Sequence, residues 1–183
     1  MKNRLQSLIL GILICILIIR CNTNSTSNKT DEFDIYSTIE VLDSTNGTMK
    51  TIPIVERKIS IPSNIDLDEK INRLLDSISK YCFNNLKIQS LGVFQNNKGY
   101  KSLKINLLEN PGFKIPDSLG KYHSWYDFFQ GSTGGQQTTI TLTESILQRN
   151  YKGKWIDQIE FYYQNDTIGD WDHIALSGQI KRK

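Results

Sequence analysis

The strongest constraint on the fold of this chain is an apolar stripe within residues 67–82. Apolar side chains recur there at three- and four-residue intervals, which places them on one face of an α-helix. They are Leu67, Ile71, Leu74, Leu75, Ile78 and Cys82. Asp66 and Glu69 stand three residues apart at the start of the stripe, the spacing of a capping box that satisfies free backbone N–H groups. The pattern therefore predicts a helix over 67–82 whose apolar face lies on a sheet.

Alternating apolar and polar residues on both sides of this helix predict β-strands. These stretches cover residues 35–41, 51–61, 86–93, 103–107, 155–163 and 174–180. Pro53 marks the second stretch as an edge strand or the start of a strand. A slip in the alternation between Ile88 and Leu91 indicates a bulge, and turn residues at 96–99 join the third and fourth stretches into a β-hairpin. The residues alone therefore predict several strands and a helix that packs on them.

Residue propensities do not decide the secondary structure of the segment 131–150. Its threonines are β-branched and favour a strand, whereas its Ser-containing start and its Ile-Leu-Gln-Arg end suit a helix. Its glycines at 131–135 match neither the P-loop nor the dinucleotide-binding spacing, so they predict only the start of a helix. Asp170, Asp172 and His173 predict a solvated turn rather than a metal site. No catalytic residue, cofactor or metal ligand is predicted.

The first twenty residues predict an export signal. Lys2 and Arg4 precede an apolar run over residues 8–19. A transmembrane helix needs about 20 apolar residues, whereas the apolar part of a signal peptide needs about 7–15. The length of the run therefore favours a signal peptide over residues 1–20, and a short uncleaved anchor is the alternative.

Cys21 follows this run and opens a polar segment of Asn, Thr, Ser and Lys. A cysteine in this place resembles the lipobox of bacterial lipoproteins, where the thiol is acylated with diacylglycerol and the signal is cut just before it. Arg20 departs from the small residue that the family has at that position. The resemblance implies lipidation at Cys21, a location outside the cytoplasm in the periplasm or at the cell surface, and a flexible tether over 21–33.

Charge and cysteine content both separate the export segment from the rest. The chain has 22 Lys and Arg against 19 Asp and Glu, a net charge of +3. Lys2, Arg4 and Arg20 account for that surplus, so the chain from Cys21 onward is neutral and is not expected to bind nucleic acid. Of the three cysteines only Cys82 lies in the predicted domain, which excludes an intramolecular disulfide there. Cys82 is expected to be a buried free thiol.

Residues 128–164 resemble the GerM domain of sporulation and spore-germination proteins. The matching features are Phe128 or Phe129 before Gly134-Gly135, then Thr141-Leu142-Thr143-Glu144, then a strand at 156–161. The resemblance covers about residues 56–178. It implies a helix at 135–148 and an α+β fold, in which two helices pack on one face of a mixed β-sheet. It also implies a non-enzymatic role as an assembly part of the cell envelope.

Aromatic side chains gather in the irregular stretch 110–130. Such a cluster could stack on sugars or hold a partner's side chains, or it could be packed under a long loop as part of the core. The candidate contact residues are Tyr122, Trp125, Tyr126 and, from a later segment, Trp171.

These observations predict a signal peptide, a tether and a single globular domain over 34–183. The expected function is that of a lipid-anchored envelope protein, held to the membrane by its lipidated N-terminus, whose domain contacts another envelope protein without catalysis. One alternative is a domain that binds carbohydrate or peptidoglycan through the aromatic cluster. An envelope hydrolase is the other alternative, and it requires a nucleophile or a carboxylate pair in a cleft.

Overall fold

The computed structural model describes residues 29–115 and 121–183. The predicted signal peptide, Cys21 and most of the predicted tether lie outside the described residues. The elements in chain order are β1 (Thr30–Leu42), β2 (Met49–Pro62), α2 (Leu67–Cys82), β3 (Lys87–Gln95), β4 (Lys101–Leu108), α3 (Trp125–Phe128), α4 (Ser132–Leu147), β5 (Gln158–Tyr163), β6 (Asp166–Thr167) and β7 (Gln179–Lys181).

Strands β1 and β2 form a two-stranded antiparallel sheet of their own. The register shifts between Ile35 and Tyr36, which marks a bulge in the ribbon. Among the described strands β2 pairs only with β1, so Pro53, which has no N–H, lies in an edge strand. The sequence-based assignment of this segment to an edge strand is thereby confirmed.

The second sheet has five strands in the order β3-β4-β5-β6, with β7 also paired to β5. Strands β3 and β4 are antiparallel, β4 and β5 are parallel, and β6 and β7 run antiparallel to β5. The parallel step requires a long connection, which contains α3 and α4. The expected bulge in β3 is present, because the register shifts between Ser90 and Gly92.

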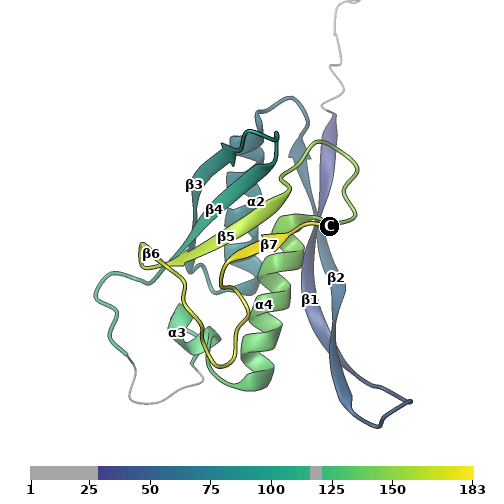
Figure 1. Ribbon diagram of the computed structural model, residues 1–183, viewed down its shortest axis with the longest axis vertical. Helices are drawn as coiled ribbons and strands as arrows, with labels where there is room; N and C mark the ends of the chain where they lie inside the picture. Colours follow the sequence, from purple (N-terminus) through teal and green to yellow (C-terminus); the bar gives the residue numbers. More distant parts are fainter. Residues whose placement is uncertain (1–28, 116–120) are drawn as a thin grey trace, which may run out of the picture.

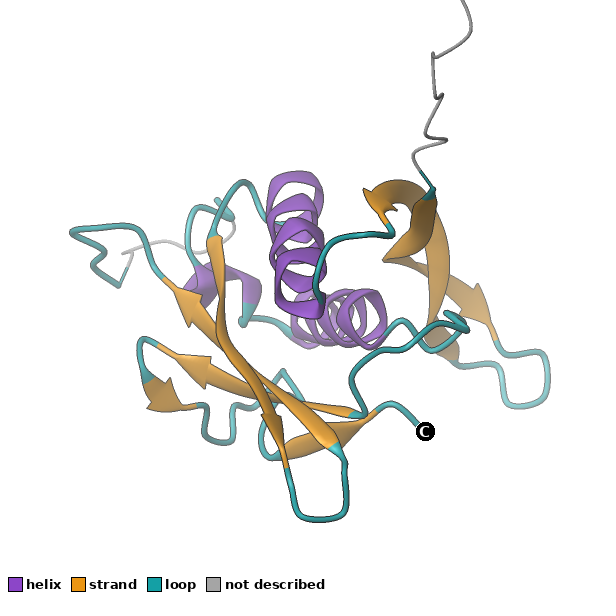
Figure 2. Ribbon diagram, turned by 90° about the horizontal axis from the view of Figure 1, so that it is seen from above, coloured by secondary structure: helices purple, strands orange, loops and turns teal. Residues whose placement is uncertain are grey.

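Helices α2 and α4 form a layer between the two sheets (Figures 1 and 2). The buried stripe of α2 includes Ile71, Leu74, Leu75 and Ile78, and Asp66 caps the helix by accepting the N–H of Glu69. The same hydrophobic core contains Phe33 of β1 and residues of β4 and β5. One core therefore joins all three layers.

The side chains of α4 hold β1 by its backbone edge. The Gln148 carboxamide accepts the N–H of Asp34 at 3.0 Å and donates to the Asp34 carbonyl at 2.6 Å, as a neighbouring strand would. Ser145 Oγ accepts the N–H of Tyr36 at 2.9 Å. Gln148 is buried and has a positive φ of 48°, which ends the helix and turns the carboxamide toward β1. Side chains at the end of α4 thus satisfy three backbone groups on the edge of β1 opposite to β2.

The prediction of an α+β fold with a mixed sheet is confirmed, as are the helix over 67–82 and the hairpin around 96–99. Segment 131–150 forms a helix, α4. The strand predicted over 174–180 is limited to β7, which corrects that expectation. Ile174 and Leu176 lie in a loop and are buried. The loop is bonded to α4, since Ala175 N donates to Thr139 Oγ1 at 3.1 Å. The apolar residues that alternate in this segment are therefore buried by the packing of a loop and not by a strand.

Candidate functional site

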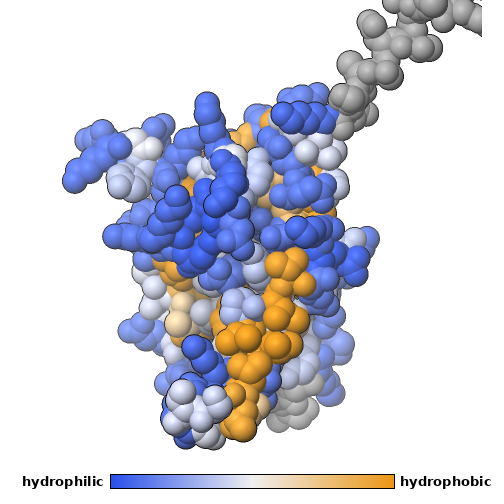
Figure 3. Space-filling model, turned by 90° about the vertical axis from the view of Figure 1, so that its right-hand side faces the viewer, coloured by the Kyte–Doolittle hydropathy of each residue, from blue (hydrophilic) through white to orange (hydrophobic). Residues whose placement is uncertain are grey.

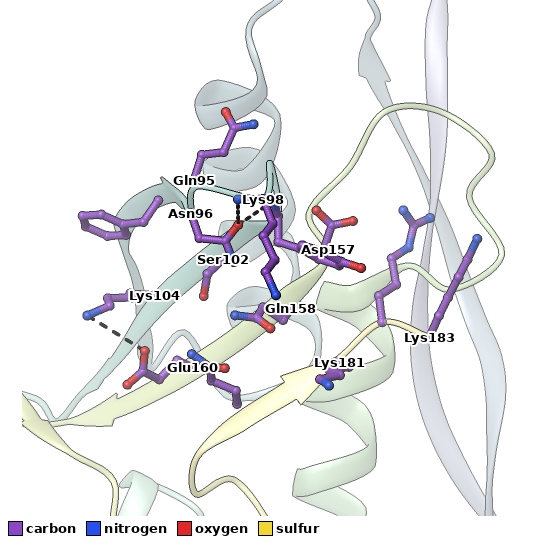
Figure 4. Close-up of a pocket in the computed structure, with 14 residues that line it drawn as sticks. Gln95, Asn96, Lys98, Ser102, Lys104, Asp157, Gln158, Glu160, Lys181 and Lys183 are labelled. Carbon is purple, nitrogen blue, oxygen red and sulfur yellow. Dashed lines mark hydrogen bonds and ion pairs between the residues drawn. The ribbon is translucent and has the colours of Figure 1, made fainter.

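The outer face of the five-stranded sheet is hollowed, and none of the described helices covers it (Figure 2). Along β4, Leu103 and Ile105 point into the core, so Ser102 and Lys104 point outward. Gln158 and Glu160 of β5 lie beside them in the parallel register. Together with the β3–β4 turn and the end of β7 these residues line a hollow of about 820 Å³, here called the basic hollow (Figure 4).

Lys104 lines the basic hollow from β4. Its Nζ donates to Tyr162 Oη at 2.9 Å and lies 3.9 Å from a carboxylate oxygen of Glu160. It also stands 5.3 Å from the centre of the Phe94 ring, within cation–π range. The hydrogen bond to Tyr162 and, as a smaller cause, the negative charge of Glu160 raise the pKa of Lys104. Its ammonium group is therefore charged at neutral pH.

Three further lysines stand around the rim. Lys98 comes from the β3–β4 turn, Lys181 from β7 and Lys183 from the segment after it (Figure 4). Among residues 29–115 and 121–183 none of the three forms an ion pair. The turn that carries Lys98 is fixed by Asn96, whose side-chain oxygen accepts the N–H groups of Lys98 and Tyr100 at 2.9 and 3.0 Å.

The two arginines near the basic hollow, unlike the lysines of the rim, form side-chain hydrogen bonds and an ion pair within the described part of the protein. Arg182 donates to the Gln148 carbonyl at 2.8 Å and to the Tyr151 carbonyl, and burial lowers its pKa from the ordinary value. Arg149 pairs with Glu144 at 3.0 Å and donates to the Lys181 carbonyl at 2.9 Å. These bonds fix the end of β7 against α4. The lysines of the rim are therefore left as the cations available to a ligand.

Two buried polar atoms of the basic hollow have no hydrogen-bond partner in the described part of the chain. They are the hydroxyl oxygen of Ser102 and Nε of Arg182. A buried polar group without a partner costs about 1–3 kcal/mol. Both atoms can donate a hydrogen bond, and neither has an acceptor among the described residues.

The four aromatic residues singled out from the sequence differ in their burial. Trp125 is completely buried, with its ring centre 4.9 Å from that of Phe83, which corrects the expectation that it contacts a partner. Tyr126 and Trp171 are half-buried and lie edge to face at 5.9 Å. Tyr122 is 44% exposed. The structure thus brings Tyr126 and Trp171 together and leaves Tyr122 apart at the surface.

A carboxylate missed by sequence reasoning organises this cluster. Glu109 is buried and accepts the N–H groups of Trp125 at 2.9 Å and Tyr126 at 2.8 Å, together with the hydroxyl of Tyr163 at 3.0 Å. Burial, and then the neighbouring Glu109, raise the pKa of Tyr163 far above the ordinary value, so its hydroxyl stays a donor. Glu109 has no local motif that would identify it, because its partners lie 16 or more residues away.

A second hollow of about 440 Å³ lies between α2, α4 and the β1–β2 ribbon. Tyr122, Phe128 and Tyr81 line it, together with Cys82 at the end of α2. Cys82 is a free cysteine, half-buried, and burial raises the pKa of its thiol to about 11. The thiol is therefore protonated at neutral pH and is a poor nucleophile.

The β1–β2 ribbon carries a continuous apolar stripe on its surface, surrounded by hydrophilic residues (Figure 3). Its most exposed apolar side chains are Ile39, Leu42, Met49 and Val55. An apolar surface of this kind often takes part in protein contacts. The sequence indicated two strands here but not which of their side chains stay uncovered.

No feature of the sequence predicted the basic hollow, because its strand residues show only the usual alternation of apolar and polar side chains. The outward positions of β4 and β5 read as the polar half of two amphipathic strands, and the lysines of the rim lie far apart along the chain. Their convergence depends on the parallel pairing of β4 with β5 and on the docking of β7.

In the described part of the chain, no group of three or more His, Cys, Asp or Glu side chains is placed to hold a metal ion. None of the described helices is both long and apolar enough to span a membrane. Comparison with known proteins gave no matching family model, no matching curated protein and no matching solved structure.

Proposed function

We propose that this chain is an exported, lipid-anchored protein of the cell envelope whose folded domain is a non-catalytic interaction module. The observation that carries the proposal is the uncovered outer face of the five-stranded sheet, with its basic hollow of about 820 Å³. Hollows of this size, lined by several polar groups on rigid strands, are typical of binding sites.

The contacts within the basic hollow favour binding over turnover. Its two carboxylates are both engaged, Glu160 by Lys104 and Asp157 by the N–H of Lys101 at 2.8 Å. A general acid or base must exchange a proton with a substrate, and these groups hold structural partners instead. The lysines of the rim offer charge and hydrogen-bond donors to a ligand.

Sequence supports the envelope location. Residues 1–20 have the composition of a signal peptide, and Cys21 stands where a lipobox cysteine would be acylated. The order of elements from α2 to β5 is also the order that the resemblance to the GerM domain implies. That resemblance is the reason to propose an assembly role in the envelope.

The anchor is tested with Cys21→Ser in full-length protein expressed in bacteria, with Cys15→Ser as the matched control. We expect Cys21→Ser to lose incorporation of a labelled fatty acid and to lose processing or membrane retention, because the acylated thiol is gone. Cys15→Ser should keep both, since Cys15 lies inside the apolar run. Membrane retention of full-length, unlabelled Cys21→Ser would instead establish an uncleaved anchor.

The interaction module is tested by photo-crosslinking in intact envelopes. A photoreactive residue at Gln179, which lines the basic hollow, should form a discrete adduct that changes the mobility of the protein. The control position is Asn72, which is exposed on α2 away from the basic hollow. Adducts at neither position, or equal adducts at both, would argue against a binding role for the basic hollow.

A further inference from the structure

We infer that the basic hollow binds a linear sugar or polyol chain that carries phosphate or carboxylate groups. The inference rests on the proposed function, because it names the class of ligand for the same surface. Charge, unsatisfied donors and shape each contribute an independent part of the argument.

Charge is concentrated at the basic hollow although the chain from Cys21 onward is neutral. The lining contains five cationic residues against two acidic ones. The two acids are already engaged by Lys104 and by the N–H of Lys101, as described above. Lys98, Lys181 and Lys183 form no ion pair within the described ranges, so no acidic side chain there neutralises their charge.

The unsatisfied donors point to oxygen atoms. Ser102 and Arg182 line the basic hollow, and their Oγ and Nε atoms are buried donors without an acceptor among the described residues, so a ligand that displaces the neighbouring side chains could supply one. Phosphate and carboxylate oxygens accept strongly from such groups, because a charged acceptor makes a hydrogen bond roughly twice as strong as a neutral one.

Size and lining indicate a chain with rings or hydroxyl groups between its charges. A single phosphate ion would leave most of the 820 Å³ unfilled. The side-chain amides of Gln95, Gln158 and Gln179 can both donate to and accept from hydroxyl groups. Phe94 and Tyr100 are 51% and 54% exposed at the same hollow and offer apolar faces on which a sugar ring can lie.

The concave shape of the basic hollow favours a flexible chain over a membrane surface as its ligand. The β3–β4 turn and the start of β1 lie at the same end of the molecule, so lipid headgroups are the natural competitor for the lysines of the rim (Figure 1). A flat bilayer would contact the lysines of the rim, whereas a flexible chain can also enter the space between them and contact Gln158 of β5.

The test compares two triple variants of the full-length protein in mild detergent. The first is Lys98→Gln/Lys181→Gln/Lys183→Gln, and the matched control is Lys50→Gln/Lys114→Gln/Lys121→Gln, which removes the same charge from exposed lysines outside the basic hollow. The probes are poly(glycerol phosphate), polygalacturonate, which carries carboxylates, and neutral dextran. Calorimetry gives the affinities, and thermal melting checks that both variants fold.

We expect the first triple variant to bind at least one anionic polymer about tenfold more weakly than the natural chain, since three partly exposed ion pairs together correspond to that factor. The control triple variant should lose less than about twofold, and binding should weaken as salt rises from about 0.05 to 0.5 M. Which polymer binds tells phosphate from carboxylate.

Three results would overturn the inference. They are equal losses in both triple variants, binding of dextran as tight as that of the polyanions, and binding of neither polyanion. A response confined to vesicles, in which association rises with phosphatidylglycerol content and only the first triple variant loses that rise, would assign the surface to a membrane instead. If any of these results is obtained but Gln179 still gives discrete crosslinks, the proposed function stands and only the ligand class is wrong. If Gln179 gives no crosslinks either, the proposed function and the ligand class are both contradicted.

Discussion

At the scale of single residues, two adjacent glycines of α4 have opposite surroundings. A Cβ atom on Gly135 would lie 2.2 Å from the carbonyl oxygen of His173, whereas a Cβ atom on Gly134 would meet nothing within 4 Å. The backbone of the 170–178 loop therefore packs directly on the first turns of α4. In the sequence this pair marked only the start of a helix, because the approach of a loop nearly 40 residues away leaves no local signal.

We predict that Gly135→Ala destabilises the protein by about 1–3 kcal/mol, because backbone atoms would have to move to admit the methyl group. Gly134→Ala should be neutral or stabilising by up to about 1 kcal/mol, since alanine favours the helix. Urea unfolding of both variants measures the difference. Equal stability of the two variants would contradict the close contact with His173.

At the scale of elements, α2 is tied to the start of β1 by an ion pair. Lys70 Nζ lies 2.6 Å from a carboxylate oxygen of Asp31 and also donates to the Ser63 carbonyl at 3.0 Å. Both side chains of the pair are largely covered. The hydrogen bond from Lys70 is the main reason that the pKa of Asp31 is lowered below 3.8. The pair therefore joins the helix layer to the β1–β2 ribbon at one end, as Gln148 does along the edge of β1.

A carboxyl group whose pKa is lowered by folding stabilises the folded state above its unfolded pKa and loses that effect as the pH falls through its folded pKa. We therefore predict that Asp31→Asn lowers the free energy of unfolding by about 1 kcal/mol at pH 7. The difference from the natural chain should be complete above about pH 5 and should shrink as the pH drops below 3.8. Urea unfolding at several pH values measures it.

The matched control is Asp76→Asn on the exposed side of the same helix, where Asp76 forms no ion pair among the described residues. Its effect should be within about 0.5 kcal/mol and should not depend on pH in the same way. If Asp31→Asn behaves like Asp76→Asn, the ion pair does not contribute to the link between α2 and β1.

At the scale of the whole molecule, two sheets enclose one helix layer and share one core. Phe33 of the ribbon, Leu74 of α2 and Phe161 of β5 are all buried in the same cluster. A core shared in this way predicts that the ribbon, the helices and the five-stranded sheet unfold in one cooperative transition. Cys82 reports that transition, since it lies at the end of α2 against this core.

We predict that Cys82, in a Cys15→Ser/Cys21→Ser chain, reacts with an aromatic disulfide at pH 8 about a hundredfold more slowly than a free thiol, because its pKa of about 11 leaves little thiolate. Labelling in rising urea should follow the loss of helical circular dichroism. The control carries Cys82→Ser and Asn72→Cys, with the new thiol exposed on the same helix, and should react quickly. Rapid labelling of Cys82 without urea, or labelling well before the loss of helix, would contradict a single cooperative core.

The sequence alone determined those structural elements whose conformation depends on residues close together in the chain. The helix of α2 and its Asp66 cap, the β3–β4 hairpin with its bulge, and the edge character of β2 follow from spacing and from the chemistry of single residues. The sequence also located the surplus charge in the first twenty residues.

Tertiary structure decided where the remaining charges lie. A neutral total says nothing about distribution, and only the parallel pairing of β4 with β5 and the docking of β7 bring Lys98, Lys104 and Lys181 to one face. It also placed Trp125 in the core and assigned Glu109 to hold it there. Local patterns fix backbone geometry over a few residues, whereas contacts between distant segments depend on how whole elements share one core.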